Sequence, residues 1–336
     1  MNIAIVGATG NVGRKIIEIL EKKQINIENL FLLASKKSEG KKVNYNGKEH
    51  IVTDLEKFDF SSVKIAFFAA GSGVAEKWAH VAAEKTIVID NSKYFRKDPD
   101  IPLIVPEVNS KKLSDVKNKN IIANANCSVI PVVVALKPLH DLYNINRIVA
   151  STYQSVSGAG KSAMDELLSQ TEDYFQNKEI DSKNFTKQIA FNAIPHIDSF
   201  LENGYTKEEQ KTTDEIKKIL DKKIKVTSTC VRIPVLVSHC ISANVEFNKK
   251  CNLDEIRKVL STSPGCKVID EHQDGGYITP VEAEDKFETF ISRIRLDESR
   301  ENTINLWIVS DNLVKGAALN AVQIAESLIT NDFYGR

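Results

Sequence analysis

Short apolar runs separated by amphipathic segments make up roughly the first 125 residues of the chain. Each run is a few residues long and almost continuously apolar, which is the pattern of a strand buried on both faces of a sheet. The segments at 14–22 and 75–84 carry apolar residues at helical spacing. Strands that alternate with helices in this way predict a parallel sheet in an α/β domain. The predicted strands are residues 2–6, 30–34, 64–70, 86–90, 103–106 and 121–123.

The pattern changes after a long apolar helix predicted at 129–143. The later strands are longer and in parts alternate apolar with polar residues, as in a sheet with one solvated face. They are predicted at 147–154, 225–233, 236–247, 291–296 and 303–309, with helices at 161–176, 206–220 and 253–260. Antiparallel strands with helices to one side predict a second domain of the α+β class. A last helix at 316–329 is expected to return to the first domain.

A glycine-rich turn joins the first predicted strand to the first predicted helix. It reads Gly7-Ala8-Thr9-Gly10-Asn11-Val12-Gly13. Small residues at this place let the backbone approach a pyrophosphate, which then lies at the helix N-terminus. The glycines could form a simple tight turn, but their position between strand and helix favours a Rossmann-like dinucleotide site. Gly71 follows another predicted strand and is expected at the same edge of the sheet.

The end of the second predicted strand indicates which dinucleotide is bound. An NAD enzyme usually places Asp or Glu there to hold the ribose 2′-hydroxyl. This chain instead has Ser35, Lys36, Lys37 and Ser38, and two hydroxyls with two cations suit a 2′-phosphate. The alternative is a solvated basic loop that continues to residue 42. We predict NADP rather than NAD.

Cys127 lies where a predicted strand meets the helix expected at 129–143. The positive end of the helix dipole and the unpaired N–H groups there favour a thiolate, which is the reactive form of cysteine. A small buried hydrophobic cysteine is the alternative at this point. The other cysteines are widely spaced and form no CxxC pair, so neither a disulfide framework nor a metal site is expected.

The composition of the chain argues against nucleic-acid and membrane partners. Lysine plus arginine and aspartate plus glutamate number 45 each in 336 residues, so no overall field attracts nucleic acid or an anionic membrane. No apolar run approaches a membrane span, and the first residues run directly into a strand without a basic leader. We therefore expect a cytoplasmic protein with small-molecule partners and no nucleic-acid or membrane partner.

Taken together, the motifs resemble those of bacterial-type aspartate-semialdehyde dehydrogenases along nearly the whole chain. Any one of them is weak, but their order is specific. They are Gly7-Ala8-Thr9-Gly10-Asn11-Val12-Gly13, Val105-Pro106-Glu107-Val108-Asn109, Asn126-Cys127-Ser128, Thr152-Tyr153-Gln154 with Ser157-Gly158-Ala159-Gly160, Glu208-Glu209-Gln210-Lys211, Arg232-Ile233-Pro234 with His239, and Asp311-Asn312 with Lys315-Gly316-Ala317-Ala318.

The resemblance implies a reaction and an organisation. The reaction is the reversible conversion of aspartyl-4-phosphate and NADPH into aspartate semialdehyde, phosphate and NADP, on the diaminopimelate route to lysine and the routes to threonine and methionine. It implies an NADP-binding Rossmann domain at 1–126 and 311–336. A catalytic and dimerisation domain with a mixed or antiparallel sheet would span 127–310. The family associates through that sheet, which implies a homodimer or homotetramer.

The resemblance also assigns roles to individual residues. Cys127 would be the nucleophile that forms a thioester, and His239 the acid/base, for which its ordinary pKa of about 6.5 is suited. Gln154 would position the intermediate beside the sulfur. The substrate's carboxylate, amine and phosphate are assigned to Arg232, to Glu208, and to Lys211 with Arg96 and Asn126, respectively. Residues assigned to NADP are Gly7, Thr9, Gly10, Asn11, Val12, Gly13, Ser35, Lys37, Ser38, Gly71, Ser157, Gly158 and Asn312.

Spacing alone leaves other interpretations of these charged residues open. Arg232 lies seven residues before His239, so the two share one face only if Pro234 breaks the strand between them. Arg232 could equally pair with a surface acid. Glu208 and Lys211 lie three apart on a predicted helix, where an exposed ion pair of little consequence is the simpler interpretation.

Four positions depart from the family pattern: Ala125 replaces a usual Pro, Lys37 an Arg, Ser238 a Gly and Val314 an Arg. None of them removes a catalytic group. The rival enzyme is another acyl-phosphate reductase, such as N-acetyl-γ-glutamyl-phosphate reductase. A non-catalytic NADP-binding or redox-sensing protein is a second rival, and a cysteine hydrolase a weaker third, because it leaves the glycine motif unexplained.

Overall fold

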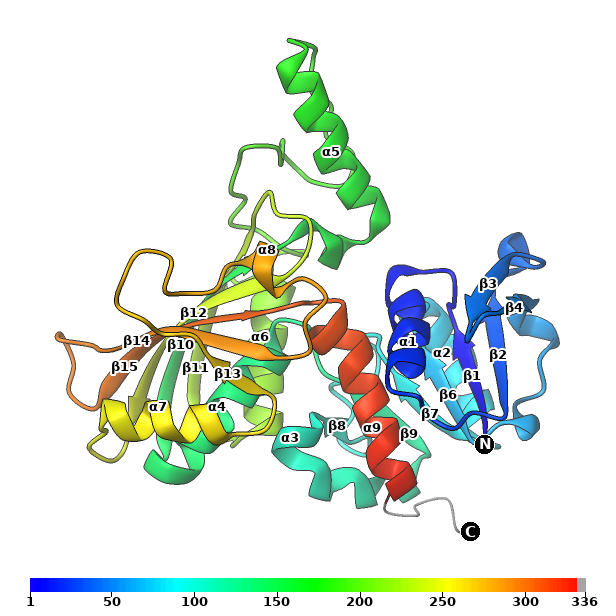
Figure 1. Cartoon of the computed structure of the whole chain (residues 1–336), viewed down its shortest axis with the longest axis horizontal. Coiled ribbons are helices and arrows are strands. Elements are labelled where there is room, and N and C mark those ends of the chain that lie inside the picture. Colours follow the sequence, from blue (N-terminus) through cyan, green and yellow to red (C-terminus); the bar gives the residue numbers. More distant parts are fainter. Residues whose placement is uncertain (331–336) are drawn as a thin grey trace. The chain divides into compact units, whose positions relative to one another are not determined.

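The computed structural model describes residues 1–330, which form two compact units (Figure 1). The first unit contains residues 1–125 and the chain from Ala317 on, and the second contains residues 126–316. Asn126 and residues 311–316 therefore group with the second unit, whereas the boundaries expected from the sequence placed them in the first. Each unit is built around its own sheet.

Within the described residues, the first unit has a seven-stranded parallel sheet. The strands in the middle of the sheet are almost completely buried. Residues such as Ile3, Ile5 and Phe67 have no solvent-accessible surface. In spatial order the strands are β5 (Thr53–Asp54), β2 (Asn29–Ala34), β1 (Asn2–Val6), β6 (Ile65–Phe68), β7 (Ile87–Asp90), β9 (Ile121–Asn124) and β8 (Leu103–Ile104). The α/β class predicted from continuous apolar runs is confirmed.

Helices pack on this sheet and on one another. α9 packs against α1 and against β7, so the last helix belongs to the first unit. The helices of this unit are α1 (Asn11–Lys22), α2 (Ser72–Ala83), the short α3 (Pro106–Asn109) and α9 (Leu319–Thr330). A small hairpin of β3 (Lys42–Tyr45) and β4 (Lys48–Ile51) was missed from the sequence, because its strands are mostly exposed and polar.

The second unit, over the part of the chain that the structure describes, has a six-stranded mixed sheet. β10 pairs in parallel with β11 and antiparallel with β12, and β12 and β14 both pair antiparallel with β15. In spatial order the strands are β11 (Lys225–Arg232), β10 (Ile145–Gln154), β12 (His239–Phe247), β15 (Thr303–Ser310), β14 (Thr289–Leu296) and β13 (Cys266–Val268).

The helices of the second unit are α4 (Val129–Tyr143), α5 (Lys161–Phe175), α6 (Lys207–Ile219), α7 (Leu253–Thr262) and α8 (Pro280–Ala283). α6 begins with a capping box, in which Thr206 and Glu209 bond each other's backbone N–H groups. α4 has the bounds predicted from its apolar residues. α6 packs against both α4 and β11, which fixes the first turn of α6 beside the ends of the central strands.

Two element boundaries differ from the prediction in ways that matter for the site. β12 begins at His239 and not at residue 236, because Ser238 has φ +75°, a left-handed conformation that interrupts the extended backbone. The last helix was expected from residue 316, but a π-helical turn at Val314–Ala318 precedes α9. Both irregular segments lie next to residues that the motifs single out.

Candidate active site

The glycine turn in the first unit has the close contacts that its motif predicts. Gly7 has φ +86°, and a Cβ there would lie 2.6 Å from the carbonyl oxygen of Ala69 at the end of the neighbouring strand. A Cβ on Gly13 would lie 2.2 Å from the carbonyl oxygen of Gly7, so α1 packs directly on the turn. Only glycine fits at either position, and the backbone is left open for a ligand.

A pocket of about 640 Å³ opens beside this turn, within the first unit. Its size suits a small-molecule or cofactor site. Gly7, Thr9, Gly10, Ser35 and Lys37, all assigned to the cofactor from the sequence, are among its lining residues, together with Lys36.

Both lysines are exposed and have no ion-pair partner within residues 1–330. The two lysines follow β2, where a Rossmann domain holds the adenosine ribose. The acidic residues Asp54 and Glu56 also line the pocket. The remaining cofactor assignments lie outside the lining of this pocket: Asn11, Val12 and Gly13 begin α1, Ser38 closes a short 3₁₀ turn, Gly71 precedes α2, and Ser157, Gly158 and Asn312 belong to the second unit.

In the second unit, Cys127 and His239 lie close together at the end of the sheet where β12 begins. The Cys127 Sγ lies 3.3 Å from the His239 Nε2. Cys127 lies two residues before the start of α4, and His239 is the first residue of β12. The Asn126 side chain accepts the Ser128 N–H, and the Asn126 carbonyl accepts the next two N–H groups. The first N–H groups of α4 are thus occupied, and His239 is the polar group that faces the sulfur.

The imidazole of His239 is held from its other side by Ser155. The backbone N–H of Ser155 lies 3.1 Å from Nδ1, and the Ser155 Oγ is also 3.1 Å from it. Burial, and after it the charge of Arg232, lowers the pKa of His239 from 6.5 to about 3. The ordinary pKa assumed from the sequence is therefore wrong for this fully buried side chain. His239 is neutral at physiological pH.

Arg232 is a buried guanidinium without an acidic partner. It ends β11, where it lies opposite Gln154 of β10, and its Nη1 donates to the Ser155 carbonyl at 2.7 Å. Only 6% of the residue is exposed, and no carboxylate within the described chain pairs with it. The surface ion pair considered for Arg232 is therefore wrong. Burial lowers its pKa more than the nearby charge of Glu208 raises it, yet a guanidinium keeps its charge, so the site holds a buried cation.

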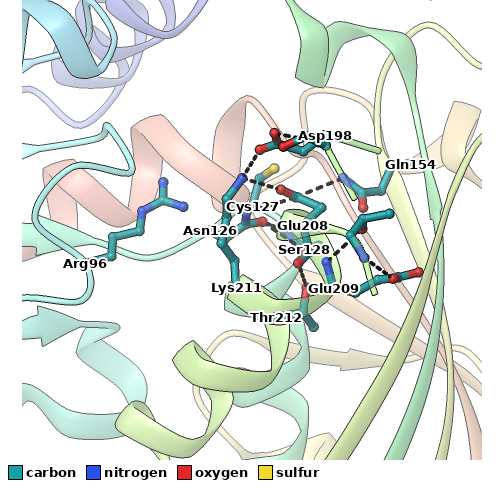
Figure 2. Close-up of polar contacts among 12 residues, drawn as sticks. Arg96, Asn126, Cys127, Ser128, Gln154, Asp198, Glu208, Glu209, Lys211 and Thr212 are labelled. Atoms are coloured by element: carbon teal, nitrogen blue, oxygen red, sulfur yellow. Dashed lines mark hydrogen bonds and ion pairs between the residues drawn. The ribbon is translucent and has the colours of Figure 1, made fainter. Parts of the chain in front are cut away.

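Glu208 bonds three other predicted residues (Figure 2). Its Oε1 accepts the Asn126 side-chain N–H at 3.0 Å and the Gln154 side-chain N–H at 3.4 Å. Its Oε2 accepts the Lys211 ammonium at 2.9 Å. Glu208 and Lys211 form the i, i+3 pair that spacing predicts, but the pair is buried and not exposed: the Glu208 side chain is 9% exposed and the Lys211 side chain 14%.

Lys211 is held from a second direction by Asp198, whose Oδ2 lies 2.7 Å from Nζ. Burial lowers the pKa of Lys211, but the Glu208 and Asp198 carboxylates outweigh it, so that the pKa is raised overall. Lys211 is therefore a firmly charged ammonium. Two of its three N–H groups are directed at carboxylates, and the third is available to a ligand.

Arg96 belongs to the first unit. Its Nε donates to the Asn124 carbonyl at 2.9 Å and its Nη2 to the Asn91 carbonyl at 3.0 Å, so the ends of β9 and β7 hold the guanidinium. A buried asparagine network supports these strand ends, because the Asn124 side chain bonds both Asn91 and Asn320.

Several residues of the second site were missed from the sequence. Asp198 lies in a stretch without helix or strand, and Ser155 follows the last residue of β10, so neither had a periodic or motif signal. Glu215 accepts the Asn126 backbone N–H at 2.7 Å. Its spacing of seven residues from Glu208 on one helix is a signal that could have found it. Gly316 packs against Cys127, since a Cβ on Gly316 would lie 3.0 Å from the Cys127 Cβ.

Ser238 is a strained residue beside His239. Its φ is +75°, and its buried Oγ has no hydrogen-bond partner among residues 1–330. We expect Ser238→Gly to raise the free energy of unfolding by about 1 kcal/mol, because it relieves the left-handed strain and removes a buried unpaired hydroxyl. Urea unfolding measures this, with Ser238→Ala as the control that removes the hydroxyl and keeps the strain. Equal stability of the two variants would contradict a contribution from φ.

Other potential chemistry is absent from the part of the chain that the structure describes. No group of three or more His, Cys, Asp or Glu residues there could hold a metal ion. No described helix is long and apolar enough to cross a membrane. Burial raises the pKa of the Cys230 and Cys240 thiols to about 12, so neither competes with Cys127 as a nucleophile.

Comparison with known proteins agrees with both units. Residues 2–116 match the semialdehyde dehydrogenase NAD binding domain, and residues 136–315 match the semialdehyde dehydrogenase dimerisation domain. The chain is 49% identical over 331 residues to the aspartate-semialdehyde dehydrogenase of Aquifex aeolicus, with 97% of each chain covered. It is 48% identical to that of Rickettsia typhi, with 98% of each covered.

A solved structure extends the comparison. The structure of aspartate-semialdehyde dehydrogenase II from Vibrio cholerae, complexed with ASA, superimposes with a TM-score of 0.96 at 46% identity and covers 98% of each chain. The resemblance inferred from the motifs is thereby confirmed, together with the fold class. The chain belongs to the aspartate-semialdehyde dehydrogenase family.

Proposed function

We propose that this enzyme is an NADP-dependent aspartate-semialdehyde dehydrogenase that works through a thioester on Cys127. It interconverts aspartyl-4-phosphate with aspartate semialdehyde and phosphate, in the biosynthesis of lysine through diaminopimelate and of threonine and methionine. We place it in the cytoplasm, as a homodimer or homotetramer. The observation that carries the proposal is the contact of 3.3 Å between the Cys127 Sγ and the His239 Nε2, beside the buried Arg232, which forms no salt bridge within residues 1–330.

The second unit supplies the groups for acyl transfer. The Cys127 Sγ attacks the acyl carbon of aspartyl-4-phosphate, and the bond between that carbon and the phosphate oxygen breaks, which releases phosphate and leaves a thioester. NADPH, when bound, supplies the hydride that reduces this thioester. The C–S bond of the resulting tetrahedral adduct then breaks to give the aldehyde and the thiolate. The His239 N–H group lies where it can stabilise charge on sulfur and on the substrate oxygen.

Charged residues of the second unit suit a free amino acid. Arg232 has an unused face for the α-carboxylate, and a guanidinium binds a carboxylate with two parallel hydrogen bonds. Glu208 is assigned to the α-ammonium group, because it is a nearly buried carboxylate of this site. The third N–H of Lys211 and the amide of Asn126 are proposed to bind phosphate, and Arg96 of the first unit is also assigned to phosphate binding. Gln154, held by Thr152 and Glu208, is proposed to position the acyl group.

The residues of the first unit fit the cofactor that we propose. The glycine turn leaves its backbone open, the neighbouring pocket has the volume for a nucleotide, and Lys36 and Lys37 are exposed cations at the ribose end. No acid of β2 or of the following turn is positioned to hold a 2′-hydroxyl, because that turn reads Ser35 to Ser38. Ser157 and Gly158 remain proposed contacts of the cofactor, and Asn312 is proposed to lie near the nicotinamide.

Replacing Lys36 and Lys37 together by alanine is expected to raise the KM for NADP about 10- to 100-fold while the KM for NAD stays within about twofold. The reason is that only NADP carries the phosphate that these cations would bind. Steady-state kinetics with both cofactors measures the effect. Lys41→Ala is the matched control, because Lys41 is an exposed lysine of the same segment that does not line the pocket. A parallel rise for both cofactors would contradict the assignment.

The reaction itself is tested by reduction of NADP with aspartate semialdehyde, with and without phosphate. We expect phosphate-dependent formation of NADPH. Turnover of N-acetylglutamate semialdehyde in place of this aldehyde would support the rival reductase, and binding of NADP without turnover of either aldehyde would support a non-catalytic role. Sedimentation velocity tests the proposed association, which a monomeric mass would contradict.

A further inference from the structure

Ser155 contacts both the imidazole of His239 and the guanidinium of Arg232. Its backbone N–H and its Oγ both face the Nδ1 of His239, each at 3.1 Å. Its carbonyl accepts the Arg232 Nη1 at 2.7 Å. The side chain is completely buried, and no motif singles it out. Ser155 is therefore the common neighbour of the imidazole and the guanidinium.

A backbone N–H can only donate a hydrogen bond. Because the N–H of Ser155 is directed at Nδ1, that nitrogen must present its lone pair. A neutral imidazole whose Nδ1 is bare has its proton on Nε2. Nε2 is the atom that lies 3.3 Å from the Cys127 sulfur, so the proton is directed at the nucleophile. A thiolate that accepts this N–H is stabilised without any positive charge on His239.

The Ser155 hydroxyl is itself held in place. Its Oγ lies 3.1 Å from the Asn312 Oδ1 and 3.1 Å from the Ser157 Oγ. The orientation of the Asn312 amide follows from the Ser238 backbone N–H, which donates to Oδ1 at 2.8 Å, and the Asn312 Nδ2 then donates to Ser157. The network thus holds the ring of His239 from behind through Ser155, while Asn312 also holds the residue that precedes His239.

We propose that Ser155 is a positioning residue that fixes His239 in the tautomer with its proton on Nε2, directed at Cys127. The inference rests on the proposed function, in which Cys127 is the nucleophile. It differs from a role as imidazolium or general base, because His239 acts here as a neutral hydrogen-bond donor to sulfur and then to the substrate oxygen. The charged groups that act on the pair are Arg232, which opposes protonation of His239, and Glu208, which favours it.

Two measurements on the full-length protein test this. Nitrogen NMR of ¹⁵N-histidine-labelled protein at neutral pH, with His239→Gln for assignment, is expected to show a protonated Nε2 and a bare Nδ1. The rate of Cys127 alkylation by iodoacetamide against pH, followed by peptide mass spectrometry, reports the thiol titration. Ser155→Ala keeps the backbone N–H that selects the tautomer and removes only the Oγ contact with Nδ1, which holds the ring in place. We expect the midpoint to rise by about 0.5 to 1 pH unit, because the Nε2 proton is then directed less well at the sulfur.

Variants separate positioning from simple packing. Ser155→Thr keeps the hydroxyl and is expected to retain the wild-type midpoint. Ser310→Ala removes another buried hydroxyl beside His239, one without a hydrogen-bond partner in residues 1–330, and is also expected to leave the midpoint unchanged. A proton on Nδ1 in the wild type, or an unchanged midpoint in Ser155→Ala, would overturn the proposal. Neither readout needs turnover, so a failure of the proposed reaction would be seen separately, as an inactive wild type with the expected tautomer.

Discussion

Replacing Cys127 by alanine is expected to lower the rate of aspartate semialdehyde oxidation by about 10⁴-fold or more. Without the sulfur no thioester forms, and the other groups of the site cannot substitute for it. Cys230 and Cys240 are buried thiols with raised pKa values of about 12, so no neighbouring cysteine takes over. Phosphate-dependent formation of NADPH at saturating substrate is the measurement.

Folding and binding should survive this change. Cys127 precedes α4 and is only partly buried, so we expect the free energy of unfolding to stay within about 1 kcal/mol and the affinity for NADP to be unaltered. Cys251→Ala is the matched control, because it removes another partly buried thiol of the same unit that no motif includes. Turnover in Cys127→Ala within tenfold of the wild type would exclude the thioester mechanism.

Arg232→Met is expected to lower kcat/KM for aspartate semialdehyde about 10³-fold. The expected loss is that of a desolvated charge-assisted contact with the substrate carboxylate, which is far larger than the loss of a surface ion pair. Methionine approximates the length of the stem, so packing around the buried side chain is largely kept. Arg232→Lys should fall between the two, because an ammonium supplies charge without the two-pronged geometry.

The aldehyde itself can be varied to isolate this contact. 3-Aminopropanal has the same aldehyde and amine but lacks the α-carboxylate, so wild-type enzyme should prefer aspartate semialdehyde strongly and Arg232→Met should not. Arg300→Met is the control, since Arg300 is an exposed arginine paired with Glu246. A variant that keeps the wild-type preference between the two aldehydes would show that Arg232 does not read the carboxylate.

Much of the fold could be predicted from the chain alone, for a physical reason. Strands buried on both faces must be continuously apolar, and glycines that meet a neighbouring backbone at 2.2 to 2.6 Å admit no other residue. These constraints leave direct marks in the sequence, as at Gly7 and Gly13. The mixed second sheet was predicted less well, because its strands bury only part of their residues and its parallel pairs, β10 with β11 and β13 with β14, have no local signature.

Residues of the candidate site could be predicted from the sequence only where they belong to a motif. The burial of Glu208 and Lys211 could not be read from an i, i+3 spacing, because burial depends on what packs over the helix. The depressed pKa of His239 arises from complete burial and the nearby Arg232, neither of which is local in sequence. Asp198 and Ser155 act through backbone position and long-range contact, so a pattern search has nothing to detect.

The geometry of the candidate site depends on the register of the central strands in the second sheet. Gln154 and Arg232 end the parallel strands β10 and β11, and His239 begins β12 on the other flank of β10. A slip of one residue in β10 would turn Gln154 to the opposite face and carry Ser155 away from the imidazole. A molecule with the wrong register is therefore expected to be inactive and not merely less selective. The activity recovered during refolding then measures the fraction of chains whose central sheet has the correct register.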